Sequence, residues 1–477
     1  MGHRDAKPVR KRAHPTRNRA LGGGALAALG ALLLVGVVSA RSQPPNVILV
    51  VIDTLRADHL SHFGYALPTA TGLDAFAGHA TRFTRAYPPS SWTGPSTASI
   101  FTGLFSARHR VDRAGTRLSD EFDTLAEVLA RNGWHTVGYS LNHNVSTKTG
   151  YHQGFDRFDD FLGGSTAYPH IEEMIGDLAQ WLERGPRQPF FLYLHPMNTH
   201  GPYRVPPDRQ TALLGRRPSR AFSYYRGHMG GITSGRELER RARVSDAYVA
   251  SLVEQYDTAI RYTTDELGRL FEMLKRQGLY DDSLIIVTSD HGEELFDHGG
   301  FSHGYSLHEE VLRVPLYVKL PRQRETRTVR ARVSVMDLYP TVLEALGIPV
   351  EGTLDGVSLL PLLRGSAEAA ARAADRTLLY QINWPKRCIA RSIVSQQYKL
   401  IEIDWNYEGA GGQTRLYDLA ADPRESVDLS GARPELLARL RGELDAAFRA
   451  FEDADAPVPA NVLDELDAKR LEALGYF

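Results

Sequence analysis

Three polar residues in two distant segments have the types that bind a divalent cation. Asp53 follows the apolar run 46–52, and Asp290 and His291 follow the apolar run 283–288. Carboxylate and imidazole ligands suit Mg²⁺, Mn²⁺, Ca²⁺ or Zn²⁺, and no thiolate is present to favour a softer metal. These residues predict one divalent metal site. The alternative is structural, with Asp53 capping a loop and Asp290 in a turn.

Thr93 is the candidate nucleophile and a further candidate metal ligand. It lies in Ser90–Leu104 (SSWTGPSTASIFTGL), where Pro95 suits the first turn of a helix and Gly103 suits its end. Thr93 or its neighbour would then be the N-cap, where free N–H groups and the helix dipole attract an anion. A hydroxyl bound there to a divalent cation would lose its proton readily and could attack phosphorus or sulfur. Capping alone would also explain a threonine here.

Other polar side chains are candidates for contacting the substrate. His200 and His303 lie in glycine-containing loops, 198–203 and 299–304, and could donate to an oxyanion or protonate a leaving group. His195 and His298 could act in the same way as His200 and His303, but with weaker support. Asn142 follows the run 136–141 and is a weaker candidate for substrate binding. We expect His308, beside two glutamates, on the surface.

The elements that must position these residues alternate between short apolar strands and helices. Strands are predicted at 46–52, 136–141, 189–194, 283–288 and 314–320, and helices at 123–132, 171–183, 245–277 and 334–346. This alternation predicts an α/β fold with a doubly wound, mostly parallel sheet flanked by helices. Ligands bind beyond the carboxyl ends of the strands in such sheets, so the candidate residues should meet at one edge.

The C-terminal part of the chain has shorter apolar segments than its centre. Shorter alternating segments at 378–382, 391–403 and 415–419 predict a small antiparallel sheet, followed by a helix at 434–451. We therefore divide the chain into a leader (1–43), a catalytic domain (44–375) and a C-terminal α+β subdomain with a helical tail (376–477).

The leader resembles a targeting segment. Residues 1–20 are strongly basic, and residues 21–40 are uncharged and just long enough to span a bilayer as a helix. We expect a membrane anchor with the catalytic domain outside the cytoplasm, in the periplasm or the extracellular space. The small residues Val38-Ser39-Ala40 leave secretion after cleavage as the alternative.

Composition limits the partners. The 477 residues contain 56 Lys and Arg against 57 Asp and Glu, a net charge of -1, so no global field attracts nucleic acid. The single cysteine, Cys388, excludes an internal disulfide and lies outside every motif. We expect no nucleic-acid partner and an anion site that is built locally.

Several motifs resemble the sulfatase family of the alkaline phosphatase superfamily. Segments 46–58 (NVILVVIDTLRAD) and 289–293 (SDHGE) resemble its two metal-binding motifs, and later landmarks stand at 355–359, 416–419, 422–425 and 474–476. The resemblance implies an alkaline phosphatase-like fold and cleavage of sulfate or phosphate esters at a metal.

The nucleophile segment departs from the family pattern, which reads Cys or Ser, any residue, Pro, any residue, Arg. Thr93 stands at the nucleophile position and Thr97 at that of the Arg. The family's cysteine is oxidised to formylglycine, but threonine cannot become this aldehyde because its β-carbon carries a methyl group. Thr54 also replaces a second metal-ligand Asp, and Asn142 stands in the segment where a Lys is expected after Gly138.

These departures favour phosphoryl transfer over cleavage of sulfate esters. A phosphothreonine can be displaced in line by water or an alcohol, whereas a sulfated threonine has no easy elimination route. We therefore expect a metal-dependent hydrolase or transferase acting on an anionic ester of a glycan, lipid head group or small molecule. A second metal, bound by His195, His200 and His303, is left open. The alternatives are an authentic sulfuric ester hydrolase and an inactive, anion-binding member of the family.

Overall fold

A computed structural model describes residues 43–113, 115–161, 170–216, 244–384, 388–404, 412–452 and 462. Residues 45–477 form one compact unit, separate from residues 1–44. The predicted anchor and the motif at 474–476 lie outside the described residues, and the domain division at residue 375 stays a prediction. No described helix is long and apolar enough to cross a membrane.

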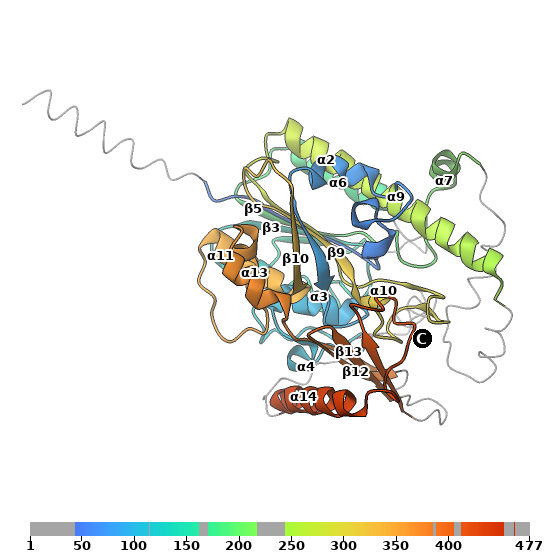
Figure 1. The fold of residues 1–477 in the computed structure, drawn as a ribbon. Coiled ribbons are helices and arrows are strands. Elements are labelled where there is room, and N and C mark those ends of the chain that lie inside the picture. Colours follow the sequence, from blue (N-terminus) through green and yellow to red (C-terminus); the bar gives the residue numbers. More distant parts are fainter. Residues whose placement is uncertain are drawn as a thin grey trace, which may run out of the picture. The chain divides into compact units, whose positions relative to one another are not determined.

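The centre of the unit is an eight-stranded sheet (Figure 1). The strand order is β10-β2-β9-β6-β1-β5-β3-β4. All neighbours pair in parallel except that β9 runs antiparallel to β2 and β6. The strands are β1 (Val47–Ile52), β2 (Thr81–Tyr87), β3 (His135–Ser140), β4 (Arg157–Asp159), β5 (Phe190–His195), β6 (Leu284–Ser289), β9 (Val314–Lys319) and β10 (Arg327–Ser334). A separate hairpin pairs β7 (Glu294–Leu295) with β8 (Phe301–Ser302).

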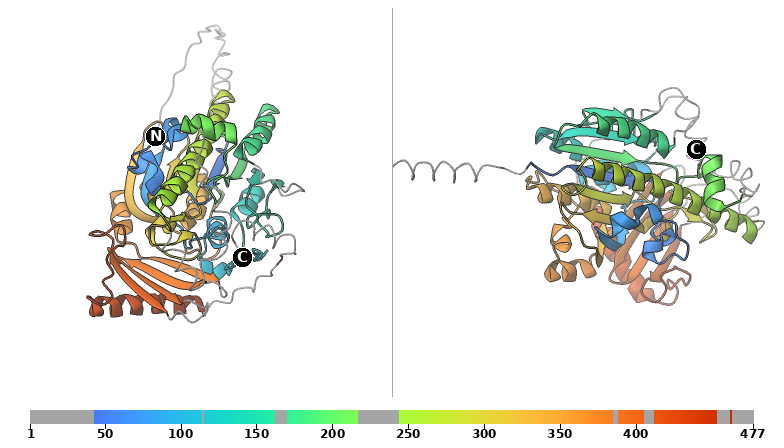
Figure 2. Two further views of the ribbon diagram at one scale, coloured as in Figure 1. Left: turned by 90° about the vertical axis from the view of Figure 1, so that its right-hand side faces the viewer. Right: turned by 90° about the horizontal axis from the view of Figure 1, so that it is seen from above.

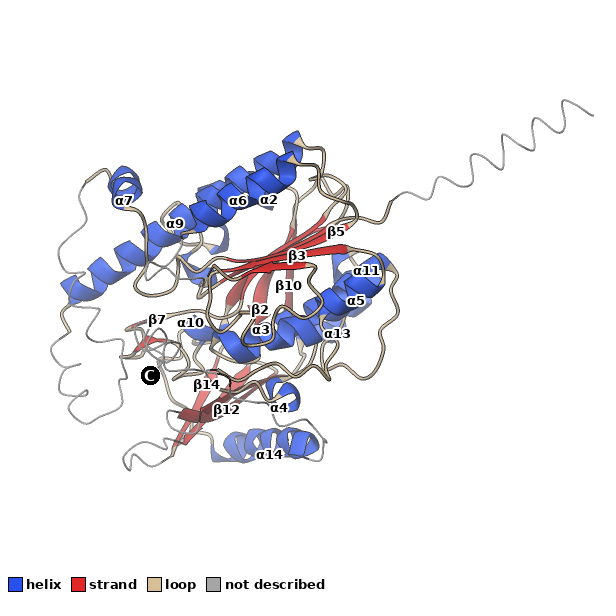
Figure 3. Ribbon diagram, turned by 180° about the vertical axis from the view of Figure 1, so that it is seen from behind, coloured by secondary structure: helices blue, strands red, loops and turns tan. Residues whose placement is uncertain are grey.

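Helices cover both faces of this sheet (Figures 1 and 3). One face packs against α2 (Asp74–Ala77), α6 (Ile171–Glu183) and α9 (Asp246–Arg276), and the other against α3 (Thr93–Thr102), α5 (Leu125–Arg131), α11 (Leu338–Leu346), α12 (Leu360–Leu363) and α13 (Ala367–Ala374). Alternate residues of β1 enter the two cores, which explains why this strand is apolar throughout. The predicted doubly wound, mostly parallel sheet is confirmed.

Short helices occupy the connections. They are η1 (Ala57–His59), η2 (Ser61–Phe63), η3 (Thr71–Leu73), α4 (Ser106–His109), α7 (Pro207–Leu214), α10 (Glu309–Leu312) and η5 (Val335–Asp337).

The predicted C-terminal antiparallel sheet and helix are confirmed as well. Strands β11 (Leu378–Trp384), β12 (Cys388–Ser395), β13 (Tyr398–Asp404) and β14 (Gln413–Asp418) pair in sequence order. One face packs against α14 (Pro434–Glu452), the red helix beside the sheet in Figure 2. The other face packs against a cluster that includes Trp92, the residue before Thr93. The small sheet therefore supports the start of α3 from outside.

Candidate active site

Four neighbouring strands bring the candidate residues together at one sheet edge. Asp53 follows β1, Asn142 follows β3, His195 ends β5, and Asp290 and His291 follow β6. The order β6-β1-β5-β3 makes these four strands adjacent. All five side chains are fully buried. The structure thus places them where open α/β sheets bind ligands.

The two carboxylates of the site are only partly satisfied. Oδ1 of Asp290 accepts the backbone N–H groups of Thr54 (3.2 Å) and His291 (3.0 Å). Asp53 Oδ1 and Asp290 Oδ2 have no hydrogen-bond partner among the described residues, although both are buried. Both oxygens face Nε2 of His291, at 3.8 and 3.4 Å. Unpaired buried carboxylate oxygens are costly, so this donor set fits a divalent cation.

Electrostatics gives the two carboxyl groups different proton affinities. Burial and the adjacent charge of Asp53 hold the pKa of Asp290 well above its usual range. Burial also acts to raise the pKa of Asp53, but the hydrogen bond with His195 and the nearby histidine charges bring it below its usual range. Burial lowers the pKa of His291, which favours the neutral imidazole that binds metals. A cation would allow both carboxyl groups to ionise together.

The Thr93 hydroxyl points into this group. Its Oγ1 lies 3.2 Å from Nε2 of His291 and 3.4 Å from Nδ2 of Asn142, which also donates to Asp53. Trp92 is the N-cap of α3, so Thr93 is the first helical residue and not the cap. The alternative in which Thr93 serves only as a cap is therefore not supported, because its hydroxyl bonds to other site residues.

His195 belongs with the carboxylates. Its Nε2 lies 3.3 Å from Asp53 Oδ2 and 3.9 Å from Asp290 Oδ2. Ligand atoms of these three residues lie within 4.8 Å of one another. From the sequence alone, His195 is only a weak candidate for contacting the substrate and a possible ligand of a second metal. The feature of the sequence that indicates a place with the carboxylates is its position directly after the apolar run 189–194.

His200 and His303 lie beside the site and are slightly exposed. They are 2% and 6% exposed, whereas Asp53, Thr93 and Asp290 have no exposure. Their ring centroids are 4.9 Å apart, and that of His303 is 4.4 Å from that of His291. Nδ1 of His303 bonds to the buried Glu293 carboxylate at 3.1 Å, which orients the ring. Sequence reasoning assigned no role to Glu293.

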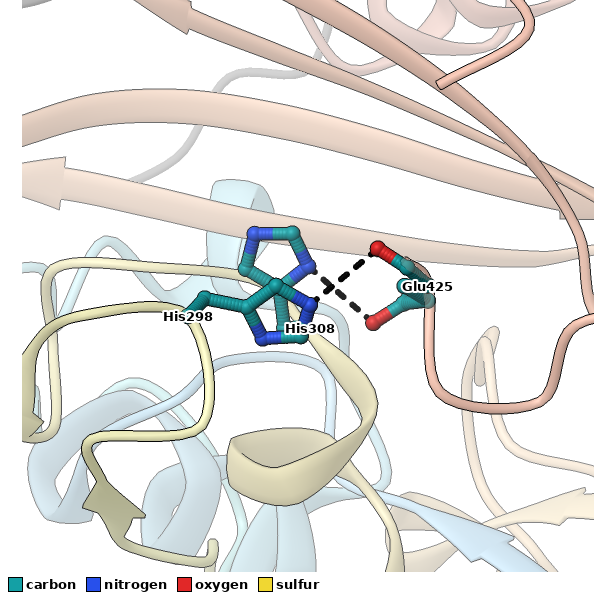
Figure 4. A group of neighbouring side chains, drawn as sticks. All are labelled: His298, His308 and Glu425. Atoms are coloured by element: carbon teal, nitrogen blue, oxygen red, sulfur yellow. Dashed lines mark hydrogen bonds and ion pairs between the residues drawn. The ribbon is translucent and has the colours of Figure 1, made fainter. Parts of the chain in front are cut away.

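A second cluster has metal-binding residue types but a different character (Figure 4). His298, His308 and Glu425 gather beside a cleft of about 1240 Å³, with the imidazole rings stacked at 3.7 Å. Nδ1 of His298 bonds to Glu310 at 2.6 Å, and Nδ1 of His308 bonds to Glu425 at 3.1 Å.

Lys399 supplies a positive charge to this second cluster. The buried Lys399 ammonium lies 2.8 Å from the Glu425 carboxylate. Glu425 in turn bonds to His308 and to the Glu309 N–H group, and so joins the C-terminal part to the start of α10. The prediction of a surface position for His308 is wrong, because Glu425 covers its ring and leaves 8% exposed.

Comparison with known proteins identifies the family. A family model described as Sulfatase matches residues 45–348, which is more than half of the chain. The chain belongs to the sulfatase family. A model for the C-terminal part of N-sulphoglucosamine sulphohydrolase matches residues 297–449. Membership makes the chain an ester hydrolase for sulfuric or phosphoric esters, in a family that generally binds a divalent metal.

Relatives of this sulfatase-family chain cover most of its length. Arylsulfatase K of Gallus gallus is 26% identical over 480 residues, which span 88% of this chain and 86% of that protein. The phosphonate monoester hydrolase of Agrobacterium radiobacter superposes with a TM-score of 0.67 at 22% identity, covering 85% and 96% of the two chains. A protein solved with its substrate D-glucosamine-2-N,6-O-disulfate superposes with a TM-score of 0.68 at 20% identity, covering 87% and 99%. These two structures share the fold.

Proposed function

We propose that Thr93 is the nucleophile of a metal-dependent reaction that transfers a phosphoryl or sulfuryl group from an ester to water or to an alcohol. The observation that carries this proposal is the position of the Thr93 hydroxyl, 3.2 Å from His291 and beside two carboxylates with unpaired oxygens. The hydrogen bonds described for this hydroxyl go to His291 and Asn142, whereas a side chain that only caps a helix accepts from the helix backbone.

Asp53, Asp290, His291 and Thr93 would hold the divalent cation. When bound, the cation would lower the pKa of the Thr93 hydroxyl and neutralise charge on the transferred group. The Asn142 amide donates to both Thr93 and Asp53, so it fixes the direction of the nucleophilic oxygen.

The reaction would take two steps, transfer of the group to Thr93 and then transfer from Thr93 to water or an alcohol. Attack by Thr93 Oγ1 on phosphorus or sulfur forms a covalent ester of Thr93 and releases the alcohol. Thr93 loses one proton and the leaving oxygen gains one, and His200 and His303 are the slightly exposed groups beside the site that could carry it. Water or an acceptor alcohol then attacks the covalent ester, which regenerates the hydroxyl.

Phosphate esters are the favoured substrates because a threonine ester of sulfate has no aldehyde route for release. A phosphothreonine can be opened by in-line attack. The similarity in fold to a phosphonate monoester hydrolase agrees with this preference. A sulfated sugar remains the second candidate, since a protein of the same fold was solved with a glucosamine disulfate as its substrate.

Mass spectrometry and kinetics test the proposal together. Purified residues 44–477, loaded with each divalent metal in turn, should cleave an aryl phosphate or an aryl sulfate. An adduct of phosphate or sulfate should appear on Thr93 and be absent in Thr93→Ala. Turnover by Thr93→Ala equal to wild type would overturn the proposal. Stoichiometric metal without any turnover would instead support an inactive anion-binding protein.

We further propose that residues 21–40 anchor the enzyme in a membrane, with the catalytic unit outside the cytoplasm. Support comes from the basic residues at 1–20 followed by an uncharged segment of spanning length. The full chain should sediment with membranes and resist carbonate extraction, while a variant without residues 1–43 should be released. Cleavage of the expressed full chain after Ala40 would favour secretion.

A further inference from the structure

Thr54 cannot replace the carboxylate that the family pattern places at its position. Its hydroxyl donates to the backbone oxygen of Thr199 at 2.7 Å. Its backbone has a left-handed φ of 55°, and its N–H group donates to Asp290. The Thr54 side chain thus holds the loop after β5 and supplies no charge to the site.

The loop held by Thr54 directly follows His195, the last residue of β5. The Asp53 backbone N–H donates to the Pro196 carbonyl oxygen at 3.0 Å, and the Thr199 hydroxyl donates to the backbone carbonyl oxygen of Asp53 at 2.6 Å. The backbone oxygen of His195 also accepts the Leu141 N–H at 3.0 Å. Bonds on both sides therefore fix the backbone of His195 relative to Asp53.

The His195 ring is oriented as metal-binding imidazoles are. Its Nδ1 lies 2.7 Å from the Tyr193 hydroxyl, while Nε2 faces Asp53 and Asp290. With Nδ1 protonated and donating to the Tyr193 oxygen, Nε2 would present its lone pair to a cation. Tyr193 is fully buried, so this orienting contact is shielded from water.

We propose that His195 binds the cation through Nε2 in place of the carboxylate lost at Thr54, and that the centre therefore selects a transition metal such as Zn²⁺ over Ca²⁺ and Mg²⁺. The proposal rests on the metal dependence proposed above. Besides the Thr93 hydroxyl, the protein ligands would then be two carboxylates and two imidazoles. Two neutral nitrogen donors would thus stand where a site built only from carboxylates has charged oxygen donors. Ca²⁺ and Mg²⁺ prefer oxygen ligands, whereas imidazole suits Zn²⁺.

Metal binding can be measured without turnover. Chelator-stripped wild type, His195→Ala and His200→Ala are titrated with Zn²⁺ and Ca²⁺ in competition with a chromophoric chelator. His200→Ala is the comparison variant, because it removes another buried imidazole that acts on Asp53 electrostatically, whereas the group of ligand atoms within 4.8 Å of one another consists of Asp53, His195 and Asp290. We expect His195→Ala to lose more than about 100-fold in Zn²⁺ affinity, since losing only a second-shell partner of a ligand costs about 10- to 100-fold. His200→Ala should retain wild-type affinity.

The outcomes separate this inference from the proposed function. Wild-type Zn²⁺ affinity in His195→Ala would overturn the role of His195 while leaving a metal site. A wild type that prefers Ca²⁺ or Mg²⁺ would overturn the selectivity. A wild type that binds no metal at all would overturn the proposed metal dependence itself.

Two conservative variants keep the test decisive if His195→Ala does not fold. Tyr193→Phe removes only the hydroxyl that orients His195 and should weaken Zn²⁺ binding about 10-fold, as second-shell losses do. In Co²⁺-loaded protein the same change should shift the visible absorption bands. Thr54→Asp returns a carboxylate and should raise Ca²⁺ affinity relative to Zn²⁺. Unchanged Zn²⁺ affinity and Co²⁺ bands in Tyr193→Phe would count against the proposal.

Discussion

Thr93 Oγ1 lies 3.2 Å from Nε2 of His291, although 198 positions separate the two residues in the chain. The hydroxyl comes from the first turn of α3, on one face of the sheet, and the imidazole follows β6. Both side chains are fully buried. Because α3 and β6 bury side chains in the same core and Trp92 packs against the small C-terminal sheet, this contact is preformed.

Neutralising one carboxylate should show separately how much the empty site destabilises the protein and how much Zn²⁺ stabilises it. We expect Asp290→Asn to stabilise the metal-free protein by about 1–3 kcal/mol, because it removes an unpaired buried carboxylate oxygen beside Asp53. The variant should gain nothing from added Zn²⁺. Wild type should gain about 2.7 kcal/mol at a Zn²⁺ concentration 100 times its Kd. Thermal denaturation in chelator and in Zn²⁺ measures both effects.

Asp112→Asn is the control for this comparison. The pKa of Asp112 is also raised, chiefly by burial, but this residue lies outside the cluster and bonds to Asn383. Its Zn²⁺ response should match that of wild type. A metal-free Asp290→Asn that is less stable than metal-free wild type would contradict the view that the carboxylates need a cation.

The fold was predictable where burial on both faces makes a strand continuously apolar, as in β1, β5 and β6. The sequence did not reveal β2 and β10, because polar residues interrupt them. Strand β2 (TRFTRAY) carries two arginines, and the first half of the edge strand β10 is largely exposed. Such strands lack the continuous apolar signal and are placed only by pairing with neighbours.

The site was predictable to the extent that polar residues follow apolar strands, which gave Asp53, Asn142, Asp290 and His291. The role of Glu293 could not be read from its segment, because its partner His303 approaches it through a loop. The burial of His308 depends on Glu425, which is 117 positions away. Contacts of this kind are set by tertiary packing, and spacing along the chain carries no sign of them.

Asn142 should contribute to the chemical step more than to binding. Its amide donates to Thr93 and Asp53, so Asn142→Ala should lower kcat about 100-fold, the scale of losing one positioned donor, with a small change in KM. Asn144→Ala is a matched control, because Asn144 Nδ2 has no hydrogen-bond partner among the described residues. Steady-state kinetics on an aryl phosphate would show the difference. Equal losses in both variants would argue for a structural role.

Glu293 should act through His303. Glu293→Gln and His303→Ala should each lower kcat, and the double variant should be little worse than His303→Ala alone, because the carboxylate acts by orienting the ring at 3.1 Å. A double-mutant cycle in kcat measures this coupling. Fully additive losses would mean that Glu293 acts independently, for example on the fold of the buried loop around it.

The second histidine cluster should make stability depend on pH. Burial acts to lower the pKa of His298, but the hydrogen bond and charge of Glu310 and the charge of Glu425 raise it from 6.5 to about 9. The folded state therefore holds this proton more tightly than the unfolded state. Its contribution is complete below pH 6.5 and is lost as pH rises through about 9, and solvent screening at this partly exposed ring keeps it below about 3 kcal/mol.

Removing the imidazole should abolish this dependence. The groups around His298 are Glu310, Glu425, the stacked ring of His308 and the buried Glu294, with Lys399 and Glu309 beyond Glu425. His298→Asn should therefore lower the free energy of unfolding most near pH 6 and hardly at all near pH 9.5, as measured by urea denaturation across this range. Glu310→Gln should reduce the same pH-dependent difference, because it removes the strongest favourable partner. A loss in His298→Asn that is constant with pH would show that the ring contributes packing and not charge.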